Sequence, residues 1–283
     1  FDVGLAEQPI FEGRRAEIDL LPNRQFKYRV NFDGLQLNDN HGAVCVSRPT
    51  NPTGNVITDE EMAELRAACR EKNIPLIVDG AYGLPFPGMI FTPATPVWDD
   101  NTILLLSLSK LGLPGIRTGI VVAAPEVIQL IQNNNAINSL APSRLGPTLL
   151  TPLLQGGQLQ NICEQLIRPH YEKKRDHALS VIEEVMSDLP VRIHKPEGAL
   201  FLWLWFEGLP VTSENLYQQL MARGVFVLPS RPFYPPAQSS WRHQDECIRV
   251  NYAASDETVV KGLTEIAQVV REQFQDAAAL VTG

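Results

Sequence analysis

Short apolar runs alternate with helical patterns through the first half of this chain, and this alternation limits the folds that it can adopt. Runs at 43–47, 75–79 and 103–107 have the length and composition of buried strands. Between the first two runs, Thr58 and Glu61 have the spacing of a helix capping box, so we predict a helix there. Strands separated by helices predict an α/β fold with a mainly parallel sheet.

The pattern changes near residue 170, and this change predicts two domains. We expect a large domain over 1–169 and a smaller C-terminal α/β domain over 170–283. The first forty residues are weakly patterned and predict no element. The other expected strands cover 119–123, 191–194, 199–206, 225–228 and 248–251, and the other expected helices cover 125–133, 161–189, 213–223 and 255–274.

Composition narrows the functional classes. The formal net charge of −8, from 24 basic and 32 acidic side chains, argues against nucleic acid as a partner. The longest apolar stretch, 199–206, is far too short to cross a bilayer as a helix. Four cysteines without C-x-x-C spacing predict neither a structural zinc site nor a disulfide framework. Because no signal peptide is visible, we expect a cytoplasmic protein. We also expect that it binds no membrane and no metal.

One lysine stands out from the ordinary solvated lysines of a protein surface. Lys110 follows the apolar run 102–106 directly, with Ser107 and Ser109 before it and Arg117 seven residues later. An amine beside a phosphate site is what pyridoxal 5'-phosphate (PLP) requires, since its aldehyde forms a Schiff base with a lysine. We therefore predict that Lys110 is the catalytic lysine of a PLP site. A surface lysine on a loop is the alternative.

Ser107, Ser109 and Arg117 together predict a cradle for the phosphate of PLP. They supply two hydroxyl donors and one permanently charged guanidinium, which matches a phosphate dianion. The alternative is that the serines only end a strand and that Arg117 lies on the surface. The glycines and the proline of P-G-x-R-x-G, which surround the arginine, favour the cradle.

Asp79 and Tyr82 are predicted to contact the cofactor ring. Asp79 ends a strand that we expect to be buried on both faces, where an unpaired carboxylate is unfavourable. The protonated ring nitrogen of PLP would pair with it and keep the ring electron-withdrawing. Tyr82, three residues on, would donate its phenol to the ring hydroxyl. The alternatives are a helix-capping aspartate and a packed aromatic residue.

Asn51 and Arg249 are the predicted substrate-binding residues. Asn51 lies between prolines in a rigid loop, so its amide can bind the ring oxygen of the cofactor and a substrate carboxylate. Arg249 stands inside an apolar strand, and the partner we predict for it is the α-carboxylate of an amino acid, held by two parallel hydrogen bonds. A turn asparagine and an outward-facing arginine are the alternatives.

The motifs together resemble one family, the PLP-dependent class I/II aminotransferases of fold type I. The resemblance runs from about residue 43 to 271, with N-P-T-G at 51–54, D-x-A-Y at 79–82, S-x-S-K at 107–110 and the two arginines in the family's order. It implies that Lys110 is the Schiff-base lysine and that the other named residues have the roles described above. The upstream part of the family's large domain has no counterpart here, so we expect an N-terminally truncated form.

The resemblance also implies an activity. It implies transfer of the amino group from a neutral, valine-like amino acid to a 2-oxo acid such as pyruvate. It also implies ping-pong kinetics and a homodimer. A dicarboxylate substrate would need a second cation, and Arg144 is the candidate, although a surface arginine at a helix start is the ordinary interpretation. Two other functions stay open: a PLP-binding effector domain of a transcription regulator, and a PLP-dependent lyase or synthase on the same fold.

Overall fold

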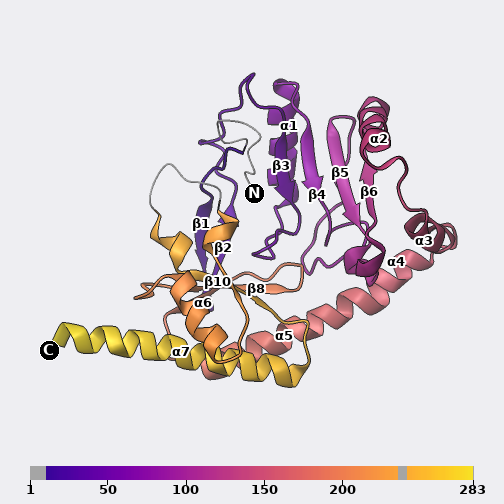
Figure 1. The fold of residues 1–283 in the computed structure, drawn as a ribbon. Helices are drawn as coiled ribbons and strands as arrows, with labels where there is room; N and C mark the ends of the chain where they lie inside the picture. Colours follow the sequence, from indigo (N-terminus) through magenta and orange to yellow (C-terminus); the bar gives the residue numbers. More distant parts are fainter. Residues whose placement is uncertain (1–10, 235–240, 283) are drawn as a thin grey trace.

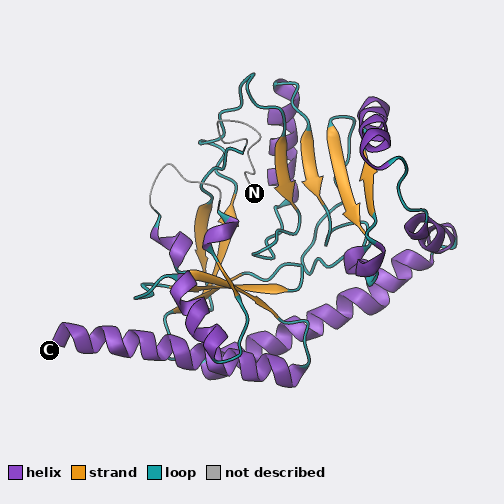
Figure 2. Ribbon diagram, viewed as in Figure 1, coloured by secondary structure: helices purple, strands orange, loops and turns teal. Residues whose placement is uncertain are grey.

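The protein, described by a computed structural model over residues 11–234 and 241–282, contains two β-sheets with helices packed against them (Figure 1). One sheet has four strands and the other has six. The helices lie around both sheets, as Figure 2 shows. The predicted α/β class is confirmed.

The four-stranded sheet has the order β3-β4-β5-β6. Its strands are β3 (Val44–Ser47), β4 (Leu76–Asp79), β5 (Thr102–Ser107) and β6 (Gly119–Val122). The first three run parallel and the edge strand β6 runs antiparallel to β5. The sheet is therefore mainly parallel, as predicted.

Helix α1 (Asp59–Glu71) covers one face of this sheet. It begins with the predicted capping box, in which the Thr58 hydroxyl accepts from the Glu61 amide and the Glu61 carboxylate accepts from the Thr58 amide. The buried side of α1 packs on alternate residues of β4 and β5. On β4 the residues facing away from α1, Ile77 and Asp79, are only half-buried. The prediction that this strand is buried on both faces is wrong, because one face is incompletely covered.

The six-stranded sheet has the order β1-β2-β7-β8-β10-β9. The strands are β1 (Glu17–Leu21), β2 (Gln25–Arg29), β7 (Val191–His194), β8 (Phe201–Phe206), β9 (Leu228–Pro229) and β10 (Cys247–Asn251). β2 pairs parallel with β7, and the other pairs are antiparallel. The expected strand at 225–228 is almost absent, since only Leu228 and Pro229 pair with β10.

The first two strands were not anticipated. A tight turn at residues 22–24 joins β1 to β2, and β2 then pairs with a strand more than 160 residues away. No local pattern announces a long-range pairing of this kind. As a result, residues 17–29 belong to the sheet of the C-terminal half, and a boundary at residue 169 does not separate the two sheets. The division into two domains stays a prediction.

The remaining helices connect and support the sheets. They are α2 (Pro125–Ser139), α3 (Leu145–Gln155), α4 (Gln158–Ile162), α5 (Arg168–Val185), α6 (Ser213–Ala222) and α7 (Asp256–Thr282). A π-helical turn at Cys163–Ile167 joins α4 to α5 within the expected helix 161–189, just before Pro169. α5 runs from the four-stranded sheet to the far side of the six-stranded one, where it packs against α7 (Figure 1).

Within the described residues, no helix is long and apolar enough to cross a membrane. Apolar clusters pack against both sheets. The largest joins β7, β8 and β10 to α5, α6 and α7, and another joins α1 to β4 and β5. A third, smaller cluster lies on the six-stranded sheet around Phe26, Tyr28, Trp203 and Cys247. Helix α2, by contrast, buries none of its residues, and its Ile137 is 83% exposed. Leu140, directly after the helix, is 88% exposed.

Candidate active site

The site begins at the carboxyl ends of the parallel strands. Register places Ser47, Asp79 and the end of β5 beside one another. The Ser47 hydroxyl donates to Asp79 Oδ2 over 3.5 Å, and the Ala81 amide donates to Asp79 Oδ1 over 2.9 Å. Since 3.5 Å is long for a hydrogen bond, Oδ2 keeps capacity for another donor. In open α/β sheets, ligands bind at this edge.

The predicted phosphate cradle forms one contiguous cluster. Ser107 ends β5, and its hydroxyl accepts from the Ser109 amide over 3.2 Å. Arg117 donates through Nη1 to the Ser109 hydroxyl over 3.3 Å and to the Pro114 carbonyl over 3.2 Å. Its guanidinium has five N–H donors, and the other donors remain available for an anion at this exposed position.

Lys110 and Tyr82 approach each other from two neighbouring strand ends. Lys110 is half-buried and lies in the short 3₁₀ helix Ser109–Leu111, just after β5. Its ammonium nitrogen is 5.3 Å from the centre of the Tyr82 ring. Tyr82 is buried, and this burial raises the pKa of its phenol to about 12. The phenol therefore stays protonated at neutral pH and can act as a hydrogen-bond donor.

Arg249 and Asn51 are far apart in sequence and belong to different sheets, but their side chains contact each other. Arg249 lies on β10 of the six-stranded sheet, and its Nη1 donates to Asn51 Oδ1 in the loop that follows β3. Burial lowers the pKa of Arg249 slightly, but a guanidinium remains charged. The pair places a cation and an amide side by side, which suits a carboxylate.

Aromatic rings connect the arginine to the lysine. The Arg249 guanidinium carbon is 4.2 Å from the centre of the Phe201 ring and 5.5 Å from that of Phe233. Phe201 packs edge-on against Tyr82, with ring centres 5.5 Å apart. Tyr82 in turn contacts Lys110. A continuous row of contacts thus leads from Asn51 to Lys110, and each ring leaves apolar surface beside the cations.

All eight residues predicted for the site lie within this arrangement. The structure brings Asp79 and Tyr82 together at the end of β4, and Asn51 and Arg249 together between the sheets. Arg144 lies apart from the site, exposed at the residue before α3, in agreement with the ordinary interpretation of a helix-start arginine.

Phe201 and Phe233 were missed as site residues. The apolar run containing Phe201 predicts a buried strand and does not show which of its rings faces a neighbouring arginine. Phe233 lies in an irregular segment with no periodic pattern. Only the pairing of β8 with β10, which sets Trp203 opposite Arg249 and Phe201 opposite Asn251, reveals this neighbourhood.

Comparison with known proteins now identifies the family. The model of aminotransferases of class I and II matches residues 8–266. The chain belongs to this family, whose enzymes use PLP.

Individual relatives agree with the family assignment. The chain is 44% identical to valine–pyruvate aminotransferase of Escherichia coli K12 over 276 residues, which cover 98% of this chain and 66% of that protein. It is 25% identical over 232 residues to aromatic-amino-acid aminotransferase 1 of Thermococcus litoralis, covering 80% of this chain and 53% of that one. The crystal structure of valine–pyruvate aminotransferase from Salmonella typhimurium LT2 superposes with a TM-score of 0.90 at 45% identity, covering 92% of this chain and 67% of that one. The chain thus spans about half to two thirds of the length of these relatives.

The residues present fit PLP. The spare acceptor capacity of Asp79 matches a protonated ring nitrogen, and the Ser107, Ser109 and Arg117 donors match a phosphate. Lys110 lies between Ser109 and Arg117 in the chain and beside the Tyr82 ring in space. These residues are the ones that would hold the cofactor.

Proposed function

We propose that this protein is an aminotransferase that moves the amino group of a neutral, valine-like amino acid to a 2-oxo acid such as pyruvate. The observation that carries the proposal is the contact of Arg249 with Asn51 in the same row of side chains as Tyr82 and Lys110. A carboxylate bound by the arginine would present its Cα toward the lysine. The similarity to valine–pyruvate aminotransferases of two bacteria supports the choice of substrates.

Binding of the substrate would use the six-stranded sheet. The Arg249 guanidinium and the Asn51 amide would hold the α-carboxylate, and the Asn51 contact orients the arginine before substrate arrives. Phe201 and Phe233 lie against the guanidinium. Phe201 is buried, whereas Phe233 is partly exposed and offers an uncharged surface that favours a neutral side chain over a second carboxylate.

The chemistry would use the four-stranded sheet. PLP, when bound, supplies an electron sink for the electron pair left at the substrate Cα. Lys110 would hold the cofactor at rest. Its amine, released when the amino group of the substrate replaces it, would remove the proton from the substrate Cα as a base and then, as an acid, deliver it to the former aldehyde carbon of PLP. Asp79 would accept a hydrogen bond from the ring nitrogen, and the protonated Tyr82 phenol would donate one to the ring oxygen. Two successive half-reactions predict ping-pong kinetics.

A homodimer and a cytoplasmic location belong to the same proposal. The exposed apolar residues of α2 and the following turn, Leu130, Ile137 and Leu140, form a surface of the kind that other polypeptide covers. Sedimentation at several protein concentrations measures the assembly state, and a purely monomeric protein would contradict the homodimer.

The test of the function is a visible absorbance spectrum of the protein with PLP, before and after L-valine. We expect a band from PLP bound to Lys110 that fades with valine and returns with pyruvate. Aspartate in place of valine is the control and should have little effect. A band that ignores every amino acid would support the effector-domain alternative, and release of an eliminated group in place of a 2-oxo acid would support the lyase.

A further inference from the structure

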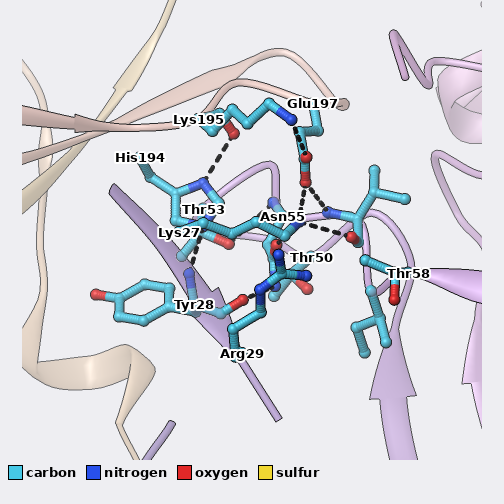
Figure 3. A network of polar contacts seen from close by, with 12 residues as sticks. Lys27, Tyr28, Arg29, Thr50, Thr53, Asn55, Thr58, His194, Lys195 and Glu197 are labelled. Atoms are coloured by element: carbon cyan, nitrogen blue, oxygen red, sulfur yellow. Dashed lines mark hydrogen bonds and ion pairs between the residues drawn. The ribbon is translucent and has the colours of Figure 1, made fainter. Parts of the chain in front are cut away.

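A buried ion pair lies between the two sheets, outside the row of site residues. Lys27 on β2 and Glu197 in the β7–β8 connection contact each other, with only 3% and 5% of their surfaces exposed (Figure 3). Charged side chains are rarely buried this deeply without a role. Lys195 approaches the same carboxylate from the solvent side, at 3.0 Å from Glu197 Oε1.

Every donor of the Lys27 ammonium group has an acceptor. Besides Glu197, the ammonium donates to Asn55 Oδ1 and to the Val56 carbonyl, each over 2.9 Å. Burial lowers the pKa of Lys27, and the contact with Glu197 opposes this change. Burial alone would raise the pKa of Glu197, but Lys27, together with the hydrogen bonds from Lys195 and the Val56 amide, outweighs it and holds that pKa below its usual value.

The pair holds the loop that carries Asn51. Glu197 accepts from the Val56 amide over 3.2 Å, so both backbone groups of Val56 bind the pair. The side-chain amide of Asn55 also donates, through Nδ2, to the Tyr28 carbonyl over 3.3 Å. Residues 55 and 56 of the first sheet's loop are thus attached to β2 and to the β7–β8 connection of the second sheet.

The attachment extends through the loop to Asn51. The Thr50 amide donates to the Asn55 carbonyl and the Gly54 amide donates to the Thr50 carbonyl, each over 2.8 Å, which closes the loop around Asn51. Gly54 has a φ of +71°, and a Cβ there would lie 2.7 Å from the Gly198 carbonyl, the residue after Glu197. Only glycine fits this close approach of two backbones.

We propose that the Lys27–Glu197 pair is a positioning element that sets where Asn51 meets Arg249. This proposal rests on the proposed function, because it assigns the pair to binding of the substrate carboxylate. Lys27 and Glu197 act through the loop and touch neither substrate nor cofactor. The pair is the link by which the six-stranded sheet, which carries Arg249, holds the loop of the four-stranded sheet, which carries Asn51.

An ion pair that only stabilises the fold and an ion pair that positions the loop should respond differently to substitution. Replacing both charges by apolar residues of similar size is often neutral or stabilising, whereas removing one partner leaves an unpaired buried charge. The double variant Lys27→Met/Glu197→Leu therefore leaves no unpaired buried charge while it removes the attachment of the loop. We expect its thermal midpoint to be lower, because the Val56 backbone groups and Asn55 Oδ1 lose their partners. Lys195→Met is the matched control, because it removes the exposed contact to the same carboxylate.

The first measurement is hydrogen exchange of the Thr50 and Gly54 amides, whose acceptors lie within the loop and not in the pair. With both proteins held equally far below their thermal midpoints, we expect at least about tenfold faster exchange at these amides in the double variant, with unchanged exchange in β8 and α5. Lys195→Met should match the parent. Parent-like exchange at Thr50 and Gly54 would overturn the proposal, and so would an acceleration spread evenly over the chain.

The second measurement is the response of the PLP-loaded protein to valine. We expect the double variant to need at least about tenfold more valine for half-saturation, with a much smaller change in the rate at saturation. An unchanged half-saturation would count against the positioning role. Hydrogen exchange needs no substrate, so a parent protein that ignores valine would refute the proposed function and leave the exchange test intact. If the double variant does not fold, Asn55→Ala, which leaves the ion pair in place, should show a smaller acceleration in the same direction.

Discussion

The strand-end cluster around Lys110 and the buried junction around Lys27 use charged groups in opposite ways. In the strand-end cluster, Lys110, Asp79 and Arg117 are half-buried or exposed and keep unused hydrogen-bonding capacity. In the junction, the donors of Lys27 are all engaged and water is excluded. Groups with capacity to spare can bind a ligand, whereas satisfied groups can only hold the structure. This contrast explains why the two regions should respond differently to substitution.

The largest effect should come from the strand-end cluster. Lys110→Arg removes the primary amine and retains the positive charge, so we expect turnover to fall by at least about 10³-fold because both cofactor attachment and proton transfer are lost. Stability should stay close to that of the parent, because arginine keeps a positive charge beside the Tyr82 ring. Single-turnover rates and thermal unfolding measure the two quantities. A variant that retains a tenth of the parent rate would refute the assignment of Lys110.

Substitution of Arg249 should have an intermediate effect, since this residue belongs to the six-stranded sheet and faces the Asn51 loop of the four-stranded sheet. Arg249→Gln removes the charge that would bind the carboxylate, and we expect about 2 kcal/mol weaker substrate binding, or about 30-fold. The half-saturation concentration of valine measures this loss. Arg231→Gln, at an exposed arginine 18 residues earlier whose contacts are with Gln244 and Asp245, is the control and should bind valine like the parent. An equal loss in both variants would remove the special role of Arg249.

Two histidines that contact Tyr28, the residue after Lys27, should dominate the response to acid. The Tyr28 amide donates to His194 Nε2, and the Tyr28 hydroxyl contacts His243 Nε2. Burial lowers the pKa of His194 to about 3 and that of His243 to about 4, both below the usual 6.5. The unfolded chain therefore binds more protons than the folded one between these values and 6.5, so stability is full above about pH 6.5 and falls as the pH drops. We expect each histidine to cost about 2 kcal/mol of unfolding free energy at pH 5.

Urea unfolding at pH 7 and pH 5 measures this dependence. His243→Gln removes one titrating group, so its acid loss should be smaller than that of the parent. An identical loss in the variant would show that other groups cause the acid sensitivity.

The smallest effect should come from the helix that follows the positioned loop. Thr58→Ala removes the hydroxyl that caps α1, and we expect about 1 kcal/mol lower unfolding free energy. Thr58→Ser keeps the hydroxyl and is the control. Since the loop is held at residues 55 and 56, before the cap, substrate binding should not change. Urea unfolding and valine titration of both variants measure the two quantities, and weaker valine binding in Thr58→Ala alone would show that the cap also positions Asn51.

Much of the strand-end cluster was predictable because its residues are close in sequence to the strands that carry them. Asp79 and Ser107 end predicted parallel strands, and parallel strands bring their carboxyl ends to one edge. Lys110 and Arg117 follow within ten residues of such an end. The capping box at Thr58 was predictable for the same reason, since it involves only four consecutive residues.

The junction was not predictable from local sequence. Lys27 and Glu197 are 170 residues apart, and each stands in a segment where a charged residue would ordinarily face solvent. The sequence by itself predicted the α/β class, the strand ends and the residues that we propose bind PLP, because these predictions follow from apolar periodicity and short-range spacing. Only the tertiary structure decided that β2 joins the second sheet, that the ion pair is buried and that Arg249 meets Asn51. These contacts depend on which distant strands pair, and the free energy of that pairing comes from the packing of the whole chain.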